Sequence, residues 1–274
     1  MESKITIKIP DNKGKILAID LFSGEIGGLL KTVGQWQERG ERRKVITTVN
    51  PEFLMLAARD EEFARSLSES DIRVVDGVAL WWLLEIKRWG VKSWPGRWRE
   101  GLRALGSVKR RGLVPGCELA EELVVRRVGE GGRVMLLGGW GDRAERSKQF
   151  FEQKVAGKAG KGYAIEACEG EPAISSQEVV TRINRFEPDL LVVAYGMGKQ
   201  EKWLARNREK IDFGVAIGVG RSMDYWSGEL ARAPEGWRRW GGEWLYSLLR
   251  EPGRWRRQIW LMKYWWWVMS GKIG

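Results

Sequence analysis

Short apolar runs alternate along the chain with longer stretches in which apolar residues recur every three or four positions. The longer stretches, such as 52–67, 142–155 and 175–186, predict amphipathic helices. The short runs predict β-strands at 4–9, 44–49, 71–75, 133–138, 163–167, 189–195 and 214–219. Strands that alternate with helices are typical of an α/β domain with a mainly parallel sheet. Because 189–195 and 214–219 are almost wholly apolar, we expect helices on both faces of these strands.

Two segments depart from this rhythm because they combine basic residues with tryptophan. Residues 87–111 contain nine Lys or Arg, one Glu and three Trp, and residues 232–274 contain nine Lys or Arg, three Glu and eight Trp. A charge run alone usually forms a solvated face, but indole rings favour a boundary between apolar and wet surroundings. We therefore expect an α/β domain over 1–231 with a basic insertion at 87–111, and a helical appendage over 232–274.

The last helix of the appendage carries an apolar stripe at helical spacing. Trp255, Ile259, Met262 and Trp266 recur on one side, and Pro252-Gly253 separates this helix from GGEWLYSLLRE. The apolar run from Ile259 to Met269 includes Lys263 and is too short to span a membrane, which needs about 20 residues. Three alternatives remain: a helix on a membrane surface, a nucleic-acid platform, or a helix packed in the core. Since three consecutive tryptophans cover most of the helix circumference, we expect at least one exposed ring.

The overall composition narrows the chemistry. A net charge of +11 and a pI of about 9.7 indicate an anionic partner such as nucleic acid, anionic lipid or a phosphorylated substrate. The absence of histidine excludes a catalytic triad built on His, and two cysteines cannot form a zinc cage. No Asp-x-Asp occurs, so the simplest carboxylate pair for a metal on a nucleotide is missing. The N-terminus lacks an apolar signal core, which favours a cytoplasmic protein.

Polar or glycine-rich segments follow five of the predicted strands. In a parallel sheet such segments meet at one edge, where ligands bind. They contain Thr48 and Asn50; Asp76-Gly77; Gly138-Gly139; Gly196 to Gln200; and Gly218 to Asp224. Each signal is weak alone, because Asp-Gly is usually a turn and a single GxG is poor evidence for a dinucleotide site. Together they predict a phosphate site beside a lone carboxylate, Asp76, that could act as a general base.

Several motifs occur in an order that resembles the WecG/TagA/CpsF glycosyltransferases, also called glycosyltransferase family 26. The likeness runs from about residue 44 to 260. The more specific motifs are KQEKW at 199–203 and the combination of RAP at 232–234 with EWLY at 243–246 and Glu251-Pro252. The resemblance implies a Rossmann-like domain with a C-terminal membrane-docking appendage.

The resemblance also implies an activity and its residues. Family members transfer a sugar, typically of the N-acetylmannosamine type, from a UDP donor to polyprenyl-diphosphate-linked N-acetylglucosamine, with inversion and with no metal or other cofactor. The expected partners are therefore the UDP-sugar, the lipid-linked acceptor and an anionic membrane surface, on the inner face of the cell membrane. The implied residues are Asp76 as the base; Thr48 and Asn50 near the acceptor; Gly138, Gly139, Gln200, Gly220 and Asp224 at the nucleotide; and Arg254 and Arg257 at the diphosphate.

The chain departs from the family pattern at four places. Val75 precedes Asp76 where the family has proline, and Ser247 follows EWLY where it has arginine, with Arg250 one turn later. The arginine that should precede Gly116 is lost or displaced to Arg111, and about twenty residues are inserted between Asp76 and Gly116.

Two other classes of function compete with this interpretation. A nucleic-acid-binding protein would also use Trp and Arg for stacking, but no RNA-binding aromatic signature is present on the predicted strands. A Rossmann-type oxidoreductase is disfavoured by the missing three-glycine fingerprint. The sequence leaves open the sugar, the pathway, the oligomeric state (a homo-oligomer included) and the role of 87–111, for which a second membrane contact is one hypothesis.

Overall fold

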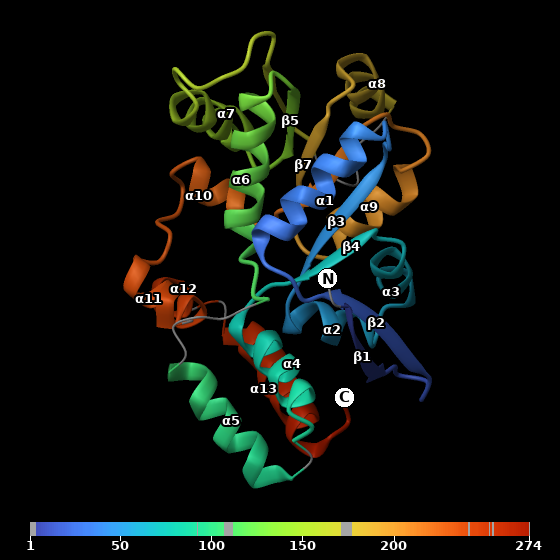
Figure 1. The fold of residues 1–274 in the computed structure, drawn as a ribbon, viewed down its shortest axis with the longest axis vertical. Coiled ribbons are helices and arrows are strands. Elements are labelled where there is room, and N and C mark those ends of the chain that lie inside the picture. Colours follow the sequence, from blue (N-terminus) through green and yellow to red (C-terminus); the bar gives the residue numbers. More distant parts are fainter. Residues whose placement is uncertain are drawn as a thin grey trace.

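A single eight-stranded sheet organises the computed structural model, which describes residues 4–91, 93–106, 112–170, 177–240, 242–251, 253 and 255–273. The strand order is β1-β2-β4-β3-β8-β7-β5-β6, and only the β1–β2 pair is antiparallel (Figure 1). The strands are β1 (Lys4–Pro10), β2 (Ile16–Phe22), β3 (Lys44–Val49), β4 (Ile72–Val75), β5 (Arg133–Gly138), β6 (Ala164–Cys168), β7 (Leu190–Ala194) and β8 (Val215–Gly218). The predicted α/β class with a mainly parallel sheet is confirmed.

All seven predicted strands are present, but two features of the N-terminal half were not predicted. Strand β2 was missed; it pairs with β1 across a tight turn in which Gly14 has a φ of +80°. The helix expected at 52–67 is in fact two helices, α2 (Pro51–Ala57) and α3 (Glu61–Ser68). The break is at Asp60, whose carboxylate accepts the Phe63 N–H at 2.9 Å and so caps α3.

Helices cover both faces of the sheet (Figure 1). One face packs against α1 (Ile26–Glu38), α6 (Gly116–Gly129), α7 (Arg143–Lys154) and α10 (Ser222–Trp226). The other face packs against α8 (Gln177–Phe186) and α9 (Lys199–Asn207) in one half, and against α2, α3, α4 (Val78–Arg88) and α13 (Trp255–Ser270) in the other. Strand β7 is buried along its whole length, as its continuous apolar run predicts.

Three further helices lie outside these layers. They are α5 (Trp94–Gly106), which lies beside α4 and α13, and α11 (Glu235–Trp240) and α12 (Glu243–Arg250), which precede α13 (Figure 1). The expected separation of two tail helices near Gly253 is therefore present, with α12 and α13 on either side.

Helix α13 has one buried and one exposed face. Tyr264 is fully buried and donates its hydroxyl hydrogen to the Ala79 carbonyl at 2.9 Å, and Trp265 packs on Trp82 with ring centroids 4.4 Å apart. Of the three consecutive tryptophans, Trp267 is buried and Trp266 is 55% exposed, so the expected exposed ring is confirmed. In the part of the chain that the structure describes, no helix is both long and apolar enough to cross a bilayer.

Candidate functional site

The carboxyl ends of five neighbouring strands form one rim of the sheet. Strands β4, β3, β8, β7 and β5 are adjacent in that order and parallel to one another. The segments after these strands therefore lie side by side, as their positions in the sequence predict. At about 4.8 Å per strand, the rim extends about 19 Å from the end of β4 to the end of β5.

Asp76 lies at the β4 end of the rim and is held by its backbone. Its N–H donates to the Val49 carbonyl at 2.8 Å, which extends the β3–β4 ladder by one residue. Gly77 follows with a φ of +86°, a conformation that glycine adopts without strain, and α4 then begins. The carboxylate accepts the Gly116 N–H at 3.3 Å, at the start of α6.

The surroundings of Asp76 favour its protonated form more than water does. Burial raises the pKa of Asp76 to about 6; the Gly116 N–H opposes this shift, and the negative charge of Glu243 adds to it. A carboxyl with this pKa is largely ionised at neutral pH and is also a better proton acceptor than an ordinary aspartate. Asp76 as a whole residue nevertheless keeps some exposed surface at the rim.

Thr48 and Asn50 lie beside Asp76. Thr48 is buried near the end of β3, and its side chain packs against Gly116: a Cβ on Gly116 would lie 3.0 Å from Thr48 Cγ2. Asn50 caps α2 by accepting the Phe53 N–H at 3.2 Å, which leaves its amide N–H₂ for another partner. The three residues that the resemblance assigns to the acceptor and the base are thus brought together.

Charged residues near Asp76 were missed by the sequence analysis. Arg232 donates to Glu118 Oε1 at 3.0 Å and lies 3.7 Å from Glu243 Oε1, and Arg238 donates to the same Glu118 oxygen at 2.9 Å. These ion pairs tie the 232–243 segment to the start of α6. Arg232 belongs to the RAP motif, which was recognised but carried no predicted role.

Cys117 is not suited to act as a nucleophile at this site. Burial raises the pKa of the Cys117 thiol to about 12, so the thiolate is scarce at neutral pH. Of Asp76 and Cys117, the two titratable groups next to Gly116, Asp76 is therefore the one that can accept a proton at neutral pH.

The other half of the rim is built on glycine. Gly138 and Gly139, after β5, have φ values of +95° and +77°, and a Cβ on Gly139 would lie 2.7 Å from Met223 Sδ. Side chains at these positions would be strained and would separate the loop from α10. Asp224 does not have a free carboxylate, because Arg143 donates to it at 2.7 Å and Arg221 Nε lies 3.7 Å away. The predicted nucleotide residues Gly139 and Asp224 thus meet around Arg143, a cation that the sequence analysis did not identify.

Gln200 lies between the two halves and is buried. Its Oε1 accepts the Gly220 N–H at 3.1 Å, which holds the loop after β8. Gln200 therefore stabilises the Gly220 loop, in addition to any direct contact with a ligand.

The predicted diphosphate arginines are not placed by the structure. Arg254 lies outside the described residues, as does Arg111, the displaced family arginine; for Arg257 only the backbone, within α13, is described. Among the residues that are described, no group of three or more Cys, Asp or Glu could hold a metal ion.

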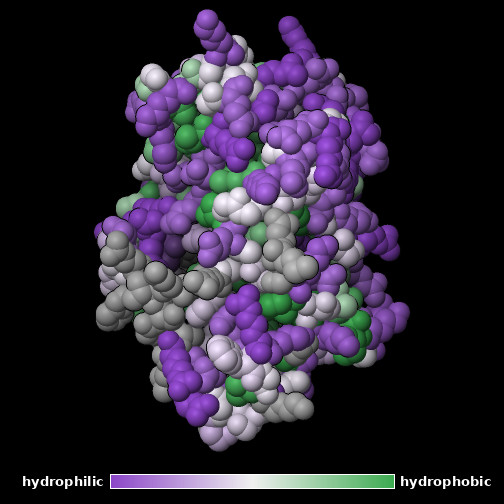
Figure 2. All heavy atoms as spheres, in the orientation of Figure 1, coloured by the Kyte–Doolittle hydropathy of each residue, from purple (hydrophilic) through white to green (hydrophobic). Residues whose placement is uncertain are grey.

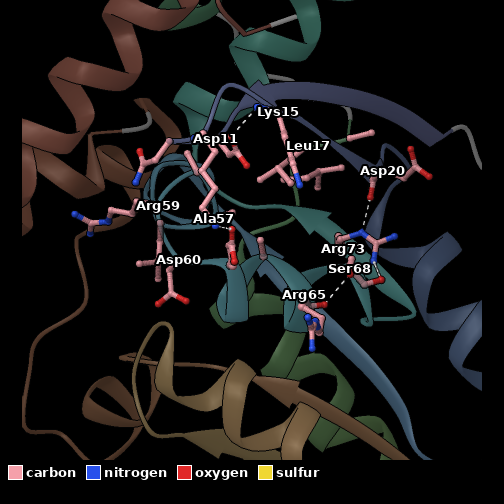
Figure 3. A pocket seen from close by; sticks show the side chains of 18 residues that line it. Asp11, Lys15, Leu17, Asp20, Ala57, Arg59, Asp60, Arg65, Ser68 and Arg73 are labelled. Carbon is pink, nitrogen blue, oxygen red and sulfur yellow. Dashed lines mark hydrogen bonds and ion pairs between the residues drawn. The ribbon is translucent and has the colours of Figure 1, made fainter.

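A large hollow of about 1050 Å³ lies elsewhere, between the β1–β2 turn, the end of α2 and α3 (Figure 3). None of the predicted site residues lines it. Several of its charges are already satisfied: Lys13 pairs with Glu61, and Arg73 donates to the carbonyls of Asp20, Leu67, Ser68 and Ser70. The rim, rather than this hollow, is therefore the candidate site.

Comparison with known proteins gives consistent matches. Residues 15–96 and 99–274 match the profile of the "Glycosyl transferase WecG/TagA/CpsF family". The chain is similar to the "N-acetylglucosaminyldiphosphoundecaprenol N-acetyl-beta-D-mannosaminyltransferase" of Bacillus subtilis (strain 168), at 28% identity over 225 residues, which cover 80% of this chain and 77% of the relative. The protein of the same name from Bacillus spizizenii (strain ATCC 23059 / NRRL B-14472 / W23) is 27% identical over 224 residues, covering 80% and 76%. These matches give no support to the nucleic-acid-binding alternative.

Proposed function

Because the chain belongs to the WecG/TagA/CpsF family of glycosyltransferases, we propose that it transfers an N-acetylmannosamine-type sugar from UDP to polyprenyl-diphosphate-linked N-acetylglucosamine. The names of its relatives support this acceptor and this sugar. The observation that carries the assignment to this chain is the position of Asp76, a carboxyl of raised pKa fixed at the end of β4 beside a glycine-lined rim.

Asp76 is the general base of the proposed reaction. Its carboxylate accepts the proton of the acceptor hydroxyl while that oxygen attacks the anomeric carbon from the side opposite UDP. The bond between the anomeric carbon and the UDP oxygen breaks, UDP leaves with the electron pair, and the configuration inverts. Thr48 and Asn50 orient the acceptor in this proposal, because they lie at the end of β3, next to the end of β4 that carries Asp76.

The donor occupies the other half of the rim. Backbone N–H groups of Gly138, Gly139 and Gly220 suit the diphosphate, and Gln200 and Asp224 hold the loops that carry them. Arginines match a diphosphate in bidentate fashion, and Arg254 and Arg257 are proposed to close over it as UDP leaves. We propose that this neutralisation replaces a metal, since the sequence lacks an Asp-x-Asp pair.

The protein works at the inner membrane surface in this proposal. The acceptor is anchored in lipid, and α13 presents Trp255, Ile259, Met262 and Trp266 along one exposed stripe. Such a helix lies in the headgroup region with its apolar side in the acyl boundary. The net charge of +11 adds attraction to anionic lipid, worth about 1 kcal/mol for each basic residue near the surface.

The proposal is tested by incubating the protein with UDP-N-acetylmannosamine and a water-soluble diphosphate-linked N-acetylglucosamine analogue. The expected result is a disaccharide of inverted configuration, formed also in the presence of EDTA. UDP-N-acetylglucosamine and UDP-glucose serve as competing donors. If no donor is transferred and none raises the melting temperature, the assignment is wrong, because a ligand that binds the folded state stabilises it.

A further inference from the structure

Exposed apolar side chains gather in α13 itself and in the segments 78–106 and 235–250. Among the described residues twelve large apolar side chains are exposed, and nine of them lie in 78–106 or 235–273. The other three described ones, Ile16, Trp140 and Tyr163, lie in the rest of the described chain, which we call the α/β body. In Figure 2 hydrophilic residues dominate the upper part, while pale or green residues reach the surface among them in the lower part, where Figure 1 places α4, α5 and α13. Concentrated exposure of this kind marks an interaction surface.

Helix α5 is attached to the end of α13. The Arg97 guanidinium donates to the carbonyl oxygens of Val268 and, at 3.1 Å, of Met269. These carbonyls belong to the last turn of α13, where a cation is favourable; the Val268 oxygen also accepts the Gly271 N–H at 3.2 Å. A Cβ on Gly271 would lie 3.2 Å from the same guanidinium, so α5 fits closely against this turn. The basic insertion is therefore fixed to the helix that carries the exposed stripe.

The outer side of α5 combines indole with positive charge. Trp98 is 53% exposed, and Trp89, at the end of α4, is 72% exposed. The side chains of Arg99 and Arg103 are 67% and 66% exposed and share one carboxylate, Glu100. Two exposed guanidiniums against one acid leave a net positive surface. The boundary of an anionic bilayer favours tryptophan beside arginine, and α5 is bonded through Arg97 to the helix that carries the other exposed apolar stripe.

We propose that α5 is a second lipid-contact element, which docks Trp89, Trp98, Arg99 and Arg103 on anionic phospholipid headgroups while α13 docks its own stripe. The inference rests on the proposed function, which places the acceptor in a membrane. It also gives the insertion at 87–111 a role. A protein held on the bilayer by one helix can rotate about that helix, whereas two lipid contacts joined through Arg97 fix the angle between the rim and the bilayer.

Vesicle co-sedimentation of the full chain tests this surface. On phosphatidylglycerol-containing vesicles, Arg99→Gln/Arg103→Gln should bind about 10- to 30-fold more weakly than the unsubstituted protein. On pure phosphatidylcholine the two should bind alike. Trp89→Ala/Trp98→Ala should weaken binding to both vesicles, and the matched control Trp140→Ala, which removes a 65% exposed indole from the α/β body, should weaken neither.

Two results would overturn the surface assignment. One is unchanged vesicle binding by both double variants while circular dichroism shows them folded. The other is loss of concentration-dependent self-association in Trp89→Ala/Trp98→Ala, which would make the surface a contact between copies of the chain. Failure of the lipid-contact proposal can be told apart from failure of the proposed function by assaying sugar transfer to the water-soluble acceptor analogue, because the α5 variants should keep that transfer.

A chain of buried hydrogen bonds carries a second, independent inference. Glu201 Oε2 accepts the Gly198 N–H at 2.7 Å, and Glu201 Oε1 accepts from Gln200 Nε2 at 2.8 Å. The side-chain oxygen of Gln200, Oε1, then accepts the Gly220 N–H at 3.1 Å. Glu201 is thus bonded to neutral groups, and burial raises its pKa to about 7. The bond from Gly198 also caps the start of α9, because Glu201 is the third residue of that helix. The bond from Gln200 is not needed for this cap, and it is the one that links Glu201 to the Gly220 loop.

We infer that Glu201 is a positioning residue for the donor: it fixes the amide orientation of Gln200, and Gln200 in turn fixes the loop at Gly220. Both Glu201 carboxyl oxygens act as acceptors in this arrangement, so the Gln200 N–H₂ points toward Glu201 and the Gln200 side-chain oxygen points toward Gly220. The inference rests on the proposed donor half of the rim.

Glu201→Gln tests this series of hydrogen bonds, because its single amide oxygen can accept from Gly198 or from Gln200 but not from both, and its N–H₂ then faces the other donor. The UDP dissociation constant and the donor KM should rise about tenfold, with kcat and the acceptor KM within about twofold. The double variant Gln200→Glu/Glu201→Gln can remake all three bonds with the roles of the side chains exchanged, and should recover most of the UDP affinity. Glu209→Gln, on the exposed surface, is the control.

Unchanged UDP affinity in folded Glu201→Gln would overturn the positioning role. So would a double variant no better than the single one, since Gln200 would then act by touching the nucleotide directly. UDP binding by calorimetry needs no transfer, so these outcomes are distinct from failure of the reaction itself.

Discussion

The α/β body and the helices around α13 place their large apolar side chains differently. In the body the strands are covered on both faces, and β5, β7 and β8 bury nearly every residue. In α13, Tyr264 is fully buried while Met262, two residues earlier, is 70% exposed. The α/β body therefore buries most of its large apolar side chains against one another, whereas α13 buries one face and leaves the other exposed to solvent.

The same two regions differ in how they hold charge. At the rim, charges are paired over long stretches of sequence, as Arg143 is with Asp224 and Arg232 with Glu118. Around α13 several cations lie over indole rings, such as Lys272 over Trp266 at 4.2 Å. A rim of paired charges suits a fixed reaction geometry, and a cation–indole surface suits a fluid, anionic boundary. Substitutions in one region should therefore leave the property of the other intact.

The largest expected effect is at the rim. Asp76→Asn removes the base without changing the size of the side chain, and Asn can still accept the Gly116 N–H. We expect the transfer rate to fall by about 10³- to 10⁴-fold, measured with the soluble acceptor, with UDP affinity and vesicle binding unchanged.

The same substitution should not lower stability. The pKa of Asp76 is raised by folding, so above pH 6 the ionised carboxylate is less favourable in the folded state than in the unfolded state. This difference lowers the free energy of unfolding by at most about 3 kcal/mol, and Asn removes it. At pH 7 the melting temperature should stay the same or rise by a few degrees. Near-normal turnover by Asp76→Asn would contradict the assigned base.

A pair of substitutions within α13 tests its two faces. Tyr264→Ala removes a fully buried ring and its hydrogen bond to Ala79, and should cost about 3–5 kcal/mol in the free energy of unfolding. Trp266→Ala on the exposed face should change it by no more than about 0.5 kcal/mol while weakening vesicle binding. Urea unfolding checks both values. Equal destabilisation by the two variants would mean that the exposed stripe packs against protein after all.

The contrast between these regions was partly predictable from the sequence. Local patterns placed Asp76 and the glycines after strands, and a parallel sheet must bring such positions to one rim. Helical spacing placed Trp255, Ile259, Met262 and Trp266 on one stripe, which is the exposed one. Both inferences depend only on the repeat of a strand or a helix.

The partners of the site residues could not be predicted in this way. Arg143 and Asp224 are 81 residues apart, and Arg232 and Glu118 are 114 apart, so their pairing depends on how α7, α10 and α6 pack. The Gly116 N–H reaches Asp76 across 40 residues for the same reason. Strand β2 was missed because ILAIDLF suits a helix about as well as a strand, and its pairing with β1 decides the outcome.

The pH dependence of the reaction should report the raised pKa of Asp76. A base must be deprotonated, so kcat/KM should fall about tenfold for each unit below pH 6 and level off above it. The measurement is a pH–rate profile between pH 4.5 and 8 in a constant-ionic-strength buffer, restricted to the range in which circular dichroism is unchanged. The acidic limb should persist in Glu201→Gln, which lacks the other carboxyl with a raised pKa. It should be absent from the residual rate of Asp76→Asn. A limb centred near pH 4 would show that the carboxyl is well solvated and would remove the electrostatic argument for its role.

The smallest expected effect is at Gly116, where α6 packs against the end of β3. A Cβ there would lie 3.0 Å from Thr48 Cγ2 and 3.1 Å from Thr48 Cβ, so Gly116→Ala must displace Thr48 or the start of α6 by a few tenths of an ångström. Because the Gly116 N–H also bonds Asp76, we expect the acceptor KM to rise, or kcat to fall, by about fivefold to tenfold, with UDP affinity unchanged. Gly27→Ala in α1 is the matched control, since a Cβ there meets nothing within 4 Å and the helix gains from alanine. If Gly116→Ala instead weakened UDP binding and left the acceptor KM unchanged, the two halves of the rim would have to exchange their assigned substrates.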